Sequence, residues 1–183
     1  MTAHTGAPGT SAPDTSAPGT RAEARRVAAT VPDPELPMLT VADLGILRDV
    51  TTEDGHLVVS LTPTYSGCPA LREIQRDVAA RLGAAGFADV EVRLQLSPPW
   101  TADWITAEGR RKLAAAGIAP PHPAPRRAEG PIPLTLSPPP SRIACPACGS
   151  TRTERTAAFS GTACKDLYRC LACAEPFEHI KEI

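Results

Sequence analysis

Long apolar runs, aromatic side chains and net charge are all scarce in this sequence of 183 residues. No apolar run is long enough to cross a bilayer or to act as a secretion signal. The formal net charge is −1, and only 4% of the residues are aromatic. We therefore expect a cytoplasmic protein with no membrane partner, in which clustered cysteines bind metal more often than they form disulfides.

Proline is abundant, and its distribution divides the chain into segments. Nine of the 21 prolines lie in residues 119–141, where they exclude a helix or a central strand. Residues 1–19 repeat small residues around Ala-Pro and have no large apolar side chain after the first methionine, so they cannot bury a core. We expect a disordered tail at 1–19, a folded domain at 20–118, a proline-rich linker at 119–141 and a second domain at 142–183.

The first domain has the hydrophobic pattern of a small α/β fold. Apolar and polar residues alternate in 57–61 and in 90–96, which predicts strands with one buried face. Between them, apolar residues recur at helical spacing from Leu71 to Leu82. The predicted order around a mixed sheet is helix, hairpin, helix, strand, helix. The other elements are expected near residues 21–29, in the hairpin formed by 48–52 and 56–62, and from the N-cap Thr106 to Gly117.

The second domain contains two Cys-x-x-Cys pairs separated by 21 residues, Cys145 with Cys148 and Cys170 with Cys173. This spacing is typical of a small β zinc ribbon, in which two tight turns place four thiolates around one ion. Four thiolates also suit iron or an iron-sulfur cluster. A domain this small buries little surface, so we expect the metal to be structural.

A zinc ribbon is often a nucleic-acid module, but the charges here do not favour that partner. Residues 142–183 contain six lysines and arginines against five aspartates and glutamates. A surplus of one positive charge is a weak footprint for a phosphate backbone. We therefore expect no nucleic-acid partner.

Two cysteines lie outside the ribbon tetrahedron. Cys68 follows a predicted strand, and Pro69 after it suits the first position of a helix. A helix N-terminus favours the thiolate and lowers its pKa, which would make Cys68 nucleophilic and a good metal ligand. Nearby carboxylates would oppose thiolate formation, so the sequence leaves the net pKa of Cys68 open. The alternative is a small residue that fills the junction between strand and helix. Cys164 is either a buried small residue or a reactive thiol.

Asp33 and Glu35 alternate with prolines in the segment 31–37. The prolines hold the backbone in a rigid turn, which favours a role of the two carboxylates in binding a metal or a partner. The alternative is that both side chains cap a short helix around residues 40–44.

Four groups of residues, in order along the chain, carry a family resemblance: DPELPMLTVADLGIL, TPTYSGCPAL, LSPPWTADWITAEGRRKLAAAGIAPP, and CPACGS with SGTACKDLYRCLACAEPFEHIKEI. They resemble the PaaD family of phenylacetyl-CoA epoxidase components over nearly the whole length after residue 30. The first domain is similar to the metal-sulfur cluster biosynthesis domain of iron-sulfur assembly factors. Within that resemblance, Asp33 and Glu35 match the acidic turn, and Cys68 matches the single cysteine before proline.

The resemblance implies an accessory protein of phenylacetate catabolism that is not itself an enzyme. The chain has neither the Glu-x-x-His pairs of a di-iron oxygenase nor a glycine-rich nucleotide loop. The implied role is iron-sulfur cluster assembly or insertion into the epoxidase reductase, with a transient cluster at Cys68. The implied partners are the reductase or oxygenase subunits and the iron-sulfur assembly machinery. The alternative is a non-catalytic structural subunit of the epoxidase complex.

Overall fold

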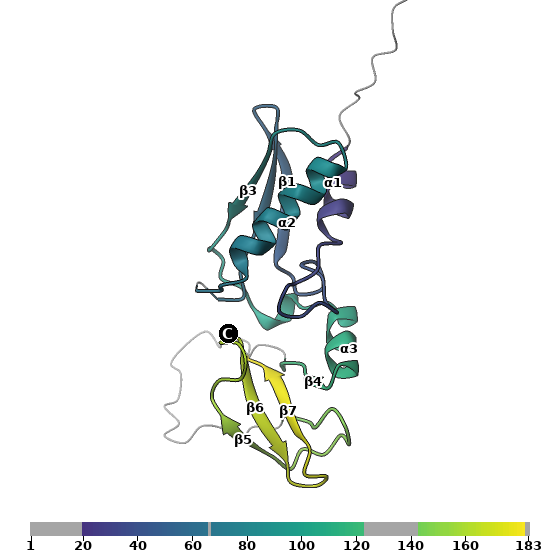
Figure 1. Ribbon diagram of the computed structural model, residues 1–183, viewed down its shortest axis with the longest axis vertical. Coiled ribbons are helices and arrows are strands. Elements are labelled where there is room, and N and C mark those ends of the chain that lie inside the picture. Colours follow the sequence, from purple (N-terminus) through teal and green to yellow (C-terminus); the bar gives the residue numbers. More distant parts are fainter. Residues whose placement is uncertain (1–19, 66, 123–142, 182–183) are drawn as a thin grey trace, which may run out of the picture.

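Two small sheets, one in each half of the chain, organise the fold (Figure 1). The computed structural model describes residues 20–65, 67–122 and 143–181. The expected disordered tail and the expected linker from residue 123 onward lie outside the described residues. The predicted α/β class is confirmed, with helices in the first half and a β-ribbon in the second.

The first sheet has three strands in the order β1-β2-β3, with bounds Leu47–Glu53, His56–Leu61 and Val90–Leu94. The first two strands form an antiparallel hairpin, and β3 pairs parallel with β2. The hairpin turns at Asp54 and Gly55, whose φ angles of 49° and 86° are those of a type I′ turn. The predicted hairpin and the mixed sheet are thus both present.

Three α-helices accompany this sheet: α1 (Arg21–Ala28), α2 (Leu71–Ala84) and α3 (Ala107–Ala115). Thr106 caps α3 as expected, because its Oγ1 accepts a hydrogen bond from the Gly109 N–H at 2.9 Å. A short 3₁₀ helix (Ala102–Trp104) precedes α3. In the described part of the chain, none of these helices has the length and hydropathy that a membrane span requires.

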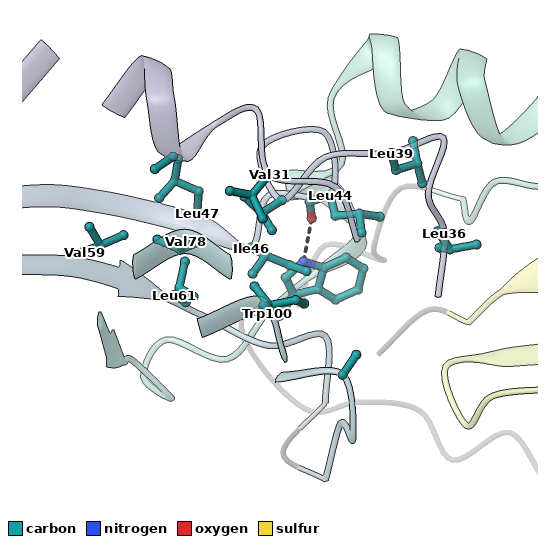
Figure 2. Packing of buried hydrophobic residues seen from close by; sticks show 14 of the residues in the cluster. Val31, Leu36, Leu39, Leu44, Ile46, Leu47, Val59, Leu61, Val78 and Trp100 are labelled. Atoms are coloured by element: carbon teal, nitrogen blue, oxygen red, sulfur yellow. Dashed lines mark hydrogen bonds between the residues drawn. The ribbon is translucent and has the colours of Figure 1, made fainter. Parts of the chain in front are cut away.

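The core of the first half lies between this sheet and helices α1 and α2 (Figure 2). The buried Trp100 extends it, and its Nε1–H donates to the Leu44 carbonyl at 2.8 Å. The expectation of a buried face along 90–96 is wrong at its end, since Leu94 and Leu96 are 39% and 59% exposed. The physical reason is that β3 is an edge strand that ends at Leu94.

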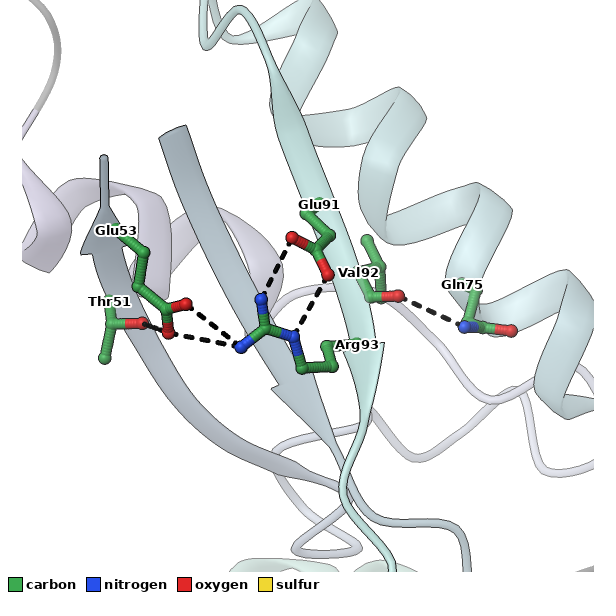
Figure 3. Close-up of polar contacts among 6 residues, drawn as sticks. All are labelled: Thr51, Glu53, Gln75, Glu91, Val92 and Arg93. Atoms are coloured by element: carbon green, nitrogen blue, oxygen red, sulfur yellow. Dashed lines mark hydrogen bonds and ion pairs between the residues drawn. The ribbon is translucent and has the colours of Figure 1, made fainter. Parts of the chain in front are cut away.

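Side chains on the exposed face of the first sheet form ion pairs that connect β3 with β1 (Figure 3). Arg93 forms ion pairs at 3.0 Å with Glu91 and with Glu53 of β1, and all three side chains are about half exposed. Such pairs contribute little stability in water. On the other side, the Gln75 amide of α2 donates to the Val92 carbonyl at 3.3 Å.

The second sheet joins both halves of the chain. Its order is β4-β7-β6-β5, with bounds Ile118–Ala119, Pro176–Ile180, Lys165–Cys170 and Thr153–Ala157. The short β4 follows α3 and pairs parallel with β7, so Ala119 belongs to this sheet although the linker was expected to begin there. At the end of β7, Ile180 is buried in the hydrophobic core of the first half. The two halves are therefore packed against each other.

Candidate metal and thiol sites

The four ribbon cysteines form a group that can hold a metal ion. Their sulfur atoms all lie within 4.8 Å of one another. Two of the separations are 3.8 Å, between Cys145 and Cys173, and 3.6 Å, between Cys148 and Cys170. Tetrahedral zinc with Zn–S bonds of about 2.3 Å requires sulfur atoms about 3.8 Å apart. The donor set therefore fits zinc, and a bound ion would join the two knuckles.

Local backbone geometry presents these sulfurs. The first pair lies in the turn before β5, and the second lies where β6 ends and turns toward β7. The Gly149 N–H donates to the Cys145 carbonyl at 2.8 Å, and Gly149 has a φ of 73° that favours glycine. The Ala172 N–H points at the Cys170 sulfur at 3.4 Å. These hydrogen bonds define the shape of each knuckle.

A separate cavity of about 20 Å³ lies between the two halves of the chain. This volume accommodates a water-sized group. Its polar corner contains two carboxylates and two thiols, from Asp33, Glu35, Cys68 and Cys164. The remaining wall is mostly apolar: Leu36, Leu44, Ile46, Pro63, Thr64, Leu71, Ile74, Trp100 and Ile180.

Asp33 is held by its own turn. Its Oδ1 accepts the backbone N–H groups of Glu35 at 2.8 Å and of Leu36 at 2.9 Å. Burial raises the pKa of the Asp33 carboxyl, although these two hydrogen bonds oppose the shift. Burial and the neighbouring Asp33 also raise the pKa of Glu35.

The alternative that these carboxylates cap a helix at residues 40–44 is wrong. Residues 41–45 form turns rather than a helix. There, Thr40 and Asp43 exchange hydrogen bonds, with the Thr40 N–H donating to Asp43 Oδ2 at 3.0 Å and the Asp43 N–H donating to Thr40 Oγ1 at 3.1 Å. The backbone N–H groups of Thr40 and Asp43 therefore have hydrogen-bond partners within that segment and do not need Asp33.

The expected position of Cys68 needs correction, and the surroundings of its thiol decide the direction of its pKa. Helix α2 begins at Leu71 with Ala70 as its N-cap, so Pro69 precedes the helix and Cys68 lies two residues before the cap. Burial is the main cause that raises the pKa of the Cys68 thiol, and Glu35 and Asp33 raise it further. The Ala70 N–H opposes the shift but does not reverse it. The surroundings of Cys68 thus favour the protonated thiol over the thiolate.

Cys164 is buried, at 8% exposure, as one of the two sequence interpretations expected. Its location was not foreseen, because its sulfur lies 4.0 Å from Glu35 Oε2, in the first half of the chain. The Thr162 Oγ1 is 3.1 Å from the same sulfur. Burial chiefly raises the pKa of the Cys164 thiol, and Glu35 adds to the shift. The only sequence signal for this residue is that the ribbon tetrahedron does not need it.

The structure thus brings Asp33, Glu35 and Cys68 to one cavity, apart from the ribbon cysteines. Among the described residues, only the ribbon group has three or more potential metal ligands within 4.8 Å of one another. The ribbon donors are therefore arranged for an ion, whereas the cavity donors are more widely separated.

Two family models match the chain. The iron-sulfur cluster assembly protein family matches residues 21–94, and the PaaD zinc beta ribbon domain matches residues 130–181. The first match contains Asp33, Glu35 and Cys68, and the second contains all four ribbon cysteines.

Individual relatives cover one or both of the matched regions. An iron-sulfur protein maturation auxiliary factor of Porphyromonas gingivalis is 34% identical over 90 residues, which cover 48% of this chain and 85% of that protein. A crystal structure of a DUF59 domain from Bacillus anthracis is 27% identical, covers 51% of this chain and 90% of that one, and gives a TM-score of 0.47. The D component of the 1,2-phenylacetyl-CoA epoxidase of Escherichia coli (strain K12) is 42% identical over 151 residues, covering 82% of this chain and 86% of that protein. The present chain belongs to the PaaD family of phenylacetyl-CoA epoxidase components.

Proposed function

We propose that this protein assists iron-sulfur cluster assembly or insertion in the reductase of a phenylacetyl-CoA epoxidase, and that it is an accessory protein rather than the catalyst. Its family membership and its relationship to maturation auxiliary factors support this role. The observation that carries the proposal is the cavity where Cys68 meets Asp33 and Glu35. In this proposal the iron is cargo that binds there and leaves again.

The chemistry of the cavity suits a transient ligand set. Thiolate and carboxylate oxygen together bind divalent iron, and ligation displaces protons from both kinds of group. Burial raises the pKa of Cys68 and of both carboxyl groups, so ion binding competes with protons. That competition weakens retention of the ion and favours its release to a partner.

The ribbon metal has a different proposed role. We take it to be zinc that stabilises the second half, because four thiolates with tetrahedral spacing leave no open coordination position for chemistry. The proposed partners are the reductase, the oxygenase subunits and the iron-sulfur assembly machinery.

The test is cluster content of the reductase in cells that carry variants of this protein. Cys68→Ala and Glu35→Gln should give reductase without its cluster and no growth on phenylacetate. The matched control is Glu73→Gln, which changes an exposed carboxylate on α2 away from the cavity and should leave growth normal.

A fully loaded reductase in the Cys68→Ala strain would refute the maturation role. The alternative function is a non-catalytic structural subunit of the epoxidase. In that case the chain should remain stoichiometric in the purified complex, and Cys68→Ala should still support growth.

A further inference from the structure

Cys164 joins the second half of the chain to the cavity of the first. Its backbone lies just before β6, and its carbonyl accepts a hydrogen bond from the Lys181 N–H at 3.0 Å, beyond the end of β7. The Lys181 side chain also donates to the Ala163 carbonyl at 2.8 Å. The turn that carries Cys164 is therefore attached to the rigid ribbon sheet, which positions the thiol at the cavity.

Two thiols from different halves of the chain thus line one cavity. Cys68 precedes α2 and Cys164 precedes β6, and both line the cavity together with Glu35. The Cys164 sulfur is 4.0 Å from Glu35 Oε2. On one tetrahedral ion with bonds of about 2.3 Å to sulfur and about 2.0 Å to oxygen, these two atoms would be about 3.5 Å apart. A small approach therefore brings this pair to ligand distance.

The charges around the cavity favour a cation over an anion. The nearby ammonium group of Lys165 is bound to Glu178 at 2.7 Å, so it neutralises that carboxylate first. Two carboxyl groups and two thiols remain on the cavity wall. Soft thiolates with carboxylate oxygen select iron(II) or zinc over magnesium or calcium. Room for one water-sized group favours a single ion over a multi-iron cluster.

We propose that Cys164 and Cys68, with Glu35, form a shared site between the two halves of the chain that binds one divalent iron ion. This inference rests on the proposed function and adds to it the form of the cargo and a ligand from the ribbon half. Each thiol that ligates the ion releases its proton to solvent, and the iron stays in the +2 state. Since the cavity donors are farther apart than the ribbon donors, binding requires these donors to move closer together. That cost makes the ion exchangeable.

Cobalt(II) is the probe that tests the shared site, because thiolate ligation gives it a charge-transfer absorption. The full-length chain is first loaded with one zinc ion and then titrated anaerobically with Co²⁺. The wild type should bind one Co²⁺ with the absorption of two thiolates. Cys164→Ser and Cys68→Ser should each halve that absorption. Each should also lower the affinity by at least the roughly 10- to 100-fold that loss of a supporting residue costs at metal sites.

The matched control is Ala163→Ser, which adds a hydroxyl beside Cys164 at an exposed position and should bind Co²⁺ as the wild type does. A second measurement needs no variant: bound Co²⁺ should protect both Cys68 and Cys164 of the wild type from iodoacetamide, as read by peptide mass spectrometry. This measurement decides the matter even if Cys164→Ser fails to fold.

The outcomes separate the two proposals. If Co²⁺ binding and protection depend on Cys68 but not on Cys164, the shared site is wrong and the proposed role of Cys68 stands. If zinc-loaded wild type binds no Co²⁺, the shared site is wrong, and reductase cluster content in the Cys68→Ala strain then decides the maturation role separately.

Discussion

At the scale of single residues, two buried aspartates have opposite effects on stability because their partners differ. Asp33 has a raised pKa because burial outweighs its hydrogen bonds to backbone N–H groups. Asp43 is also buried, but its bond to Lys112 at 2.7 Å and those from Thr40 outweigh burial and lower its pKa. An ionised Asp33 therefore opposes folding at neutral pH, whereas an ionised Asp43 favours it.

We predict that Asp33→Asn raises the melting temperature at pH 7, because the amide keeps the Oδ1 acceptor and removes a buried charge. Asp43→Asn should lower stability by about 1 kcal/mol, since it loses the Lys112 ion pair.

The pH dependence provides the check on both variants. Asp33 has a higher pKa in the folded state than in the unfolded state, where it is about 3.9. Its stabilising contribution is therefore fully present below about pH 3.9 and is lost as the pH rises through the pKa of the folded state. The Asp43 contribution is present above about pH 3.9 and is lost as the pH falls through its lowered folded value. Calorimetric scans should thus show both variants converging on the wild type in acid. A destabilised Asp33→Asn at pH 7 would contradict this account.

At the scale of elements, α3 docks against the turn at Asp43 through a glycine. A Cβ on Gly109 would lie 2.6 Å from the Asp43 carbonyl oxygen, which already accepts the Thr106 N–H at 2.9 Å. Because the clash is between the backbone of α3 and the backbone of Asp43, no side-chain rotation can relieve it. By contrast, Gly83 lies inside α2 with no atom within 4 Å of an added Cβ.

These two helical glycines form a matched pair for a test. Gly109→Ala should destabilise the protein by roughly 1–3 kcal/mol through overpacking. Gly83→Ala should stabilise it by roughly 0.5–1 kcal/mol, because alanine is the better helix former. Urea unfolding midpoints measure both changes, and shifts of the same sign would show that the docking of α3 is not constrained by Gly109.

At the scale of the whole molecule, the ribbon metal should support both halves. Ile118 and Ile180 belong to the hydrophobic core of the first half, and their strands lie in the ribbon sheet. Loss of the ribbon fold would remove Ile180 from that core. Burial of such a side chain is worth about 2–5 kcal/mol, judged from substitution by alanine.

We predict that chelation, or Cys148→Ser, lowers the unfolding midpoint of the first half as well as that of the ribbon. The two tryptophans, Trp100 and Trp104, both lie in the first half, so their fluorescence reports on it specifically. Added zinc should restore the midpoint of the wild type. Leu171→Ala, at a position that is 54% exposed in the second knuckle, is the control and should have no effect. An unchanged tryptophan transition after chelation would show that the halves fold independently.

The elements that could be predicted from the sequence are those whose cause is local. The hairpin follows from Asp-Gly between alternating segments, α2 from apolar spacing, and the grouping of the four ribbon cysteines from two short knuckles. In each case neighbouring residues define the geometry. Asp33, Glu35 and Cys68 were also singled out from the sequence, through a rigid turn, a strand-to-helix junction and a family resemblance, and they do line one cavity.

Only the tertiary structure decided that Cys164 joins this cavity and in which direction the pKa of its thiols shifts. Cys164 and Glu35 are 129 residues apart in sequence, and no local pattern encodes their contact. A helix-end position alone would lower the pKa of Cys68, and the sequence left the net direction open, but burial and two carboxylates raise it. The amino-acid sequence by itself determined which groups can bind metal. Packing of the two halves determined which of them meet, because desolvation and charge interactions act through space rather than along the chain.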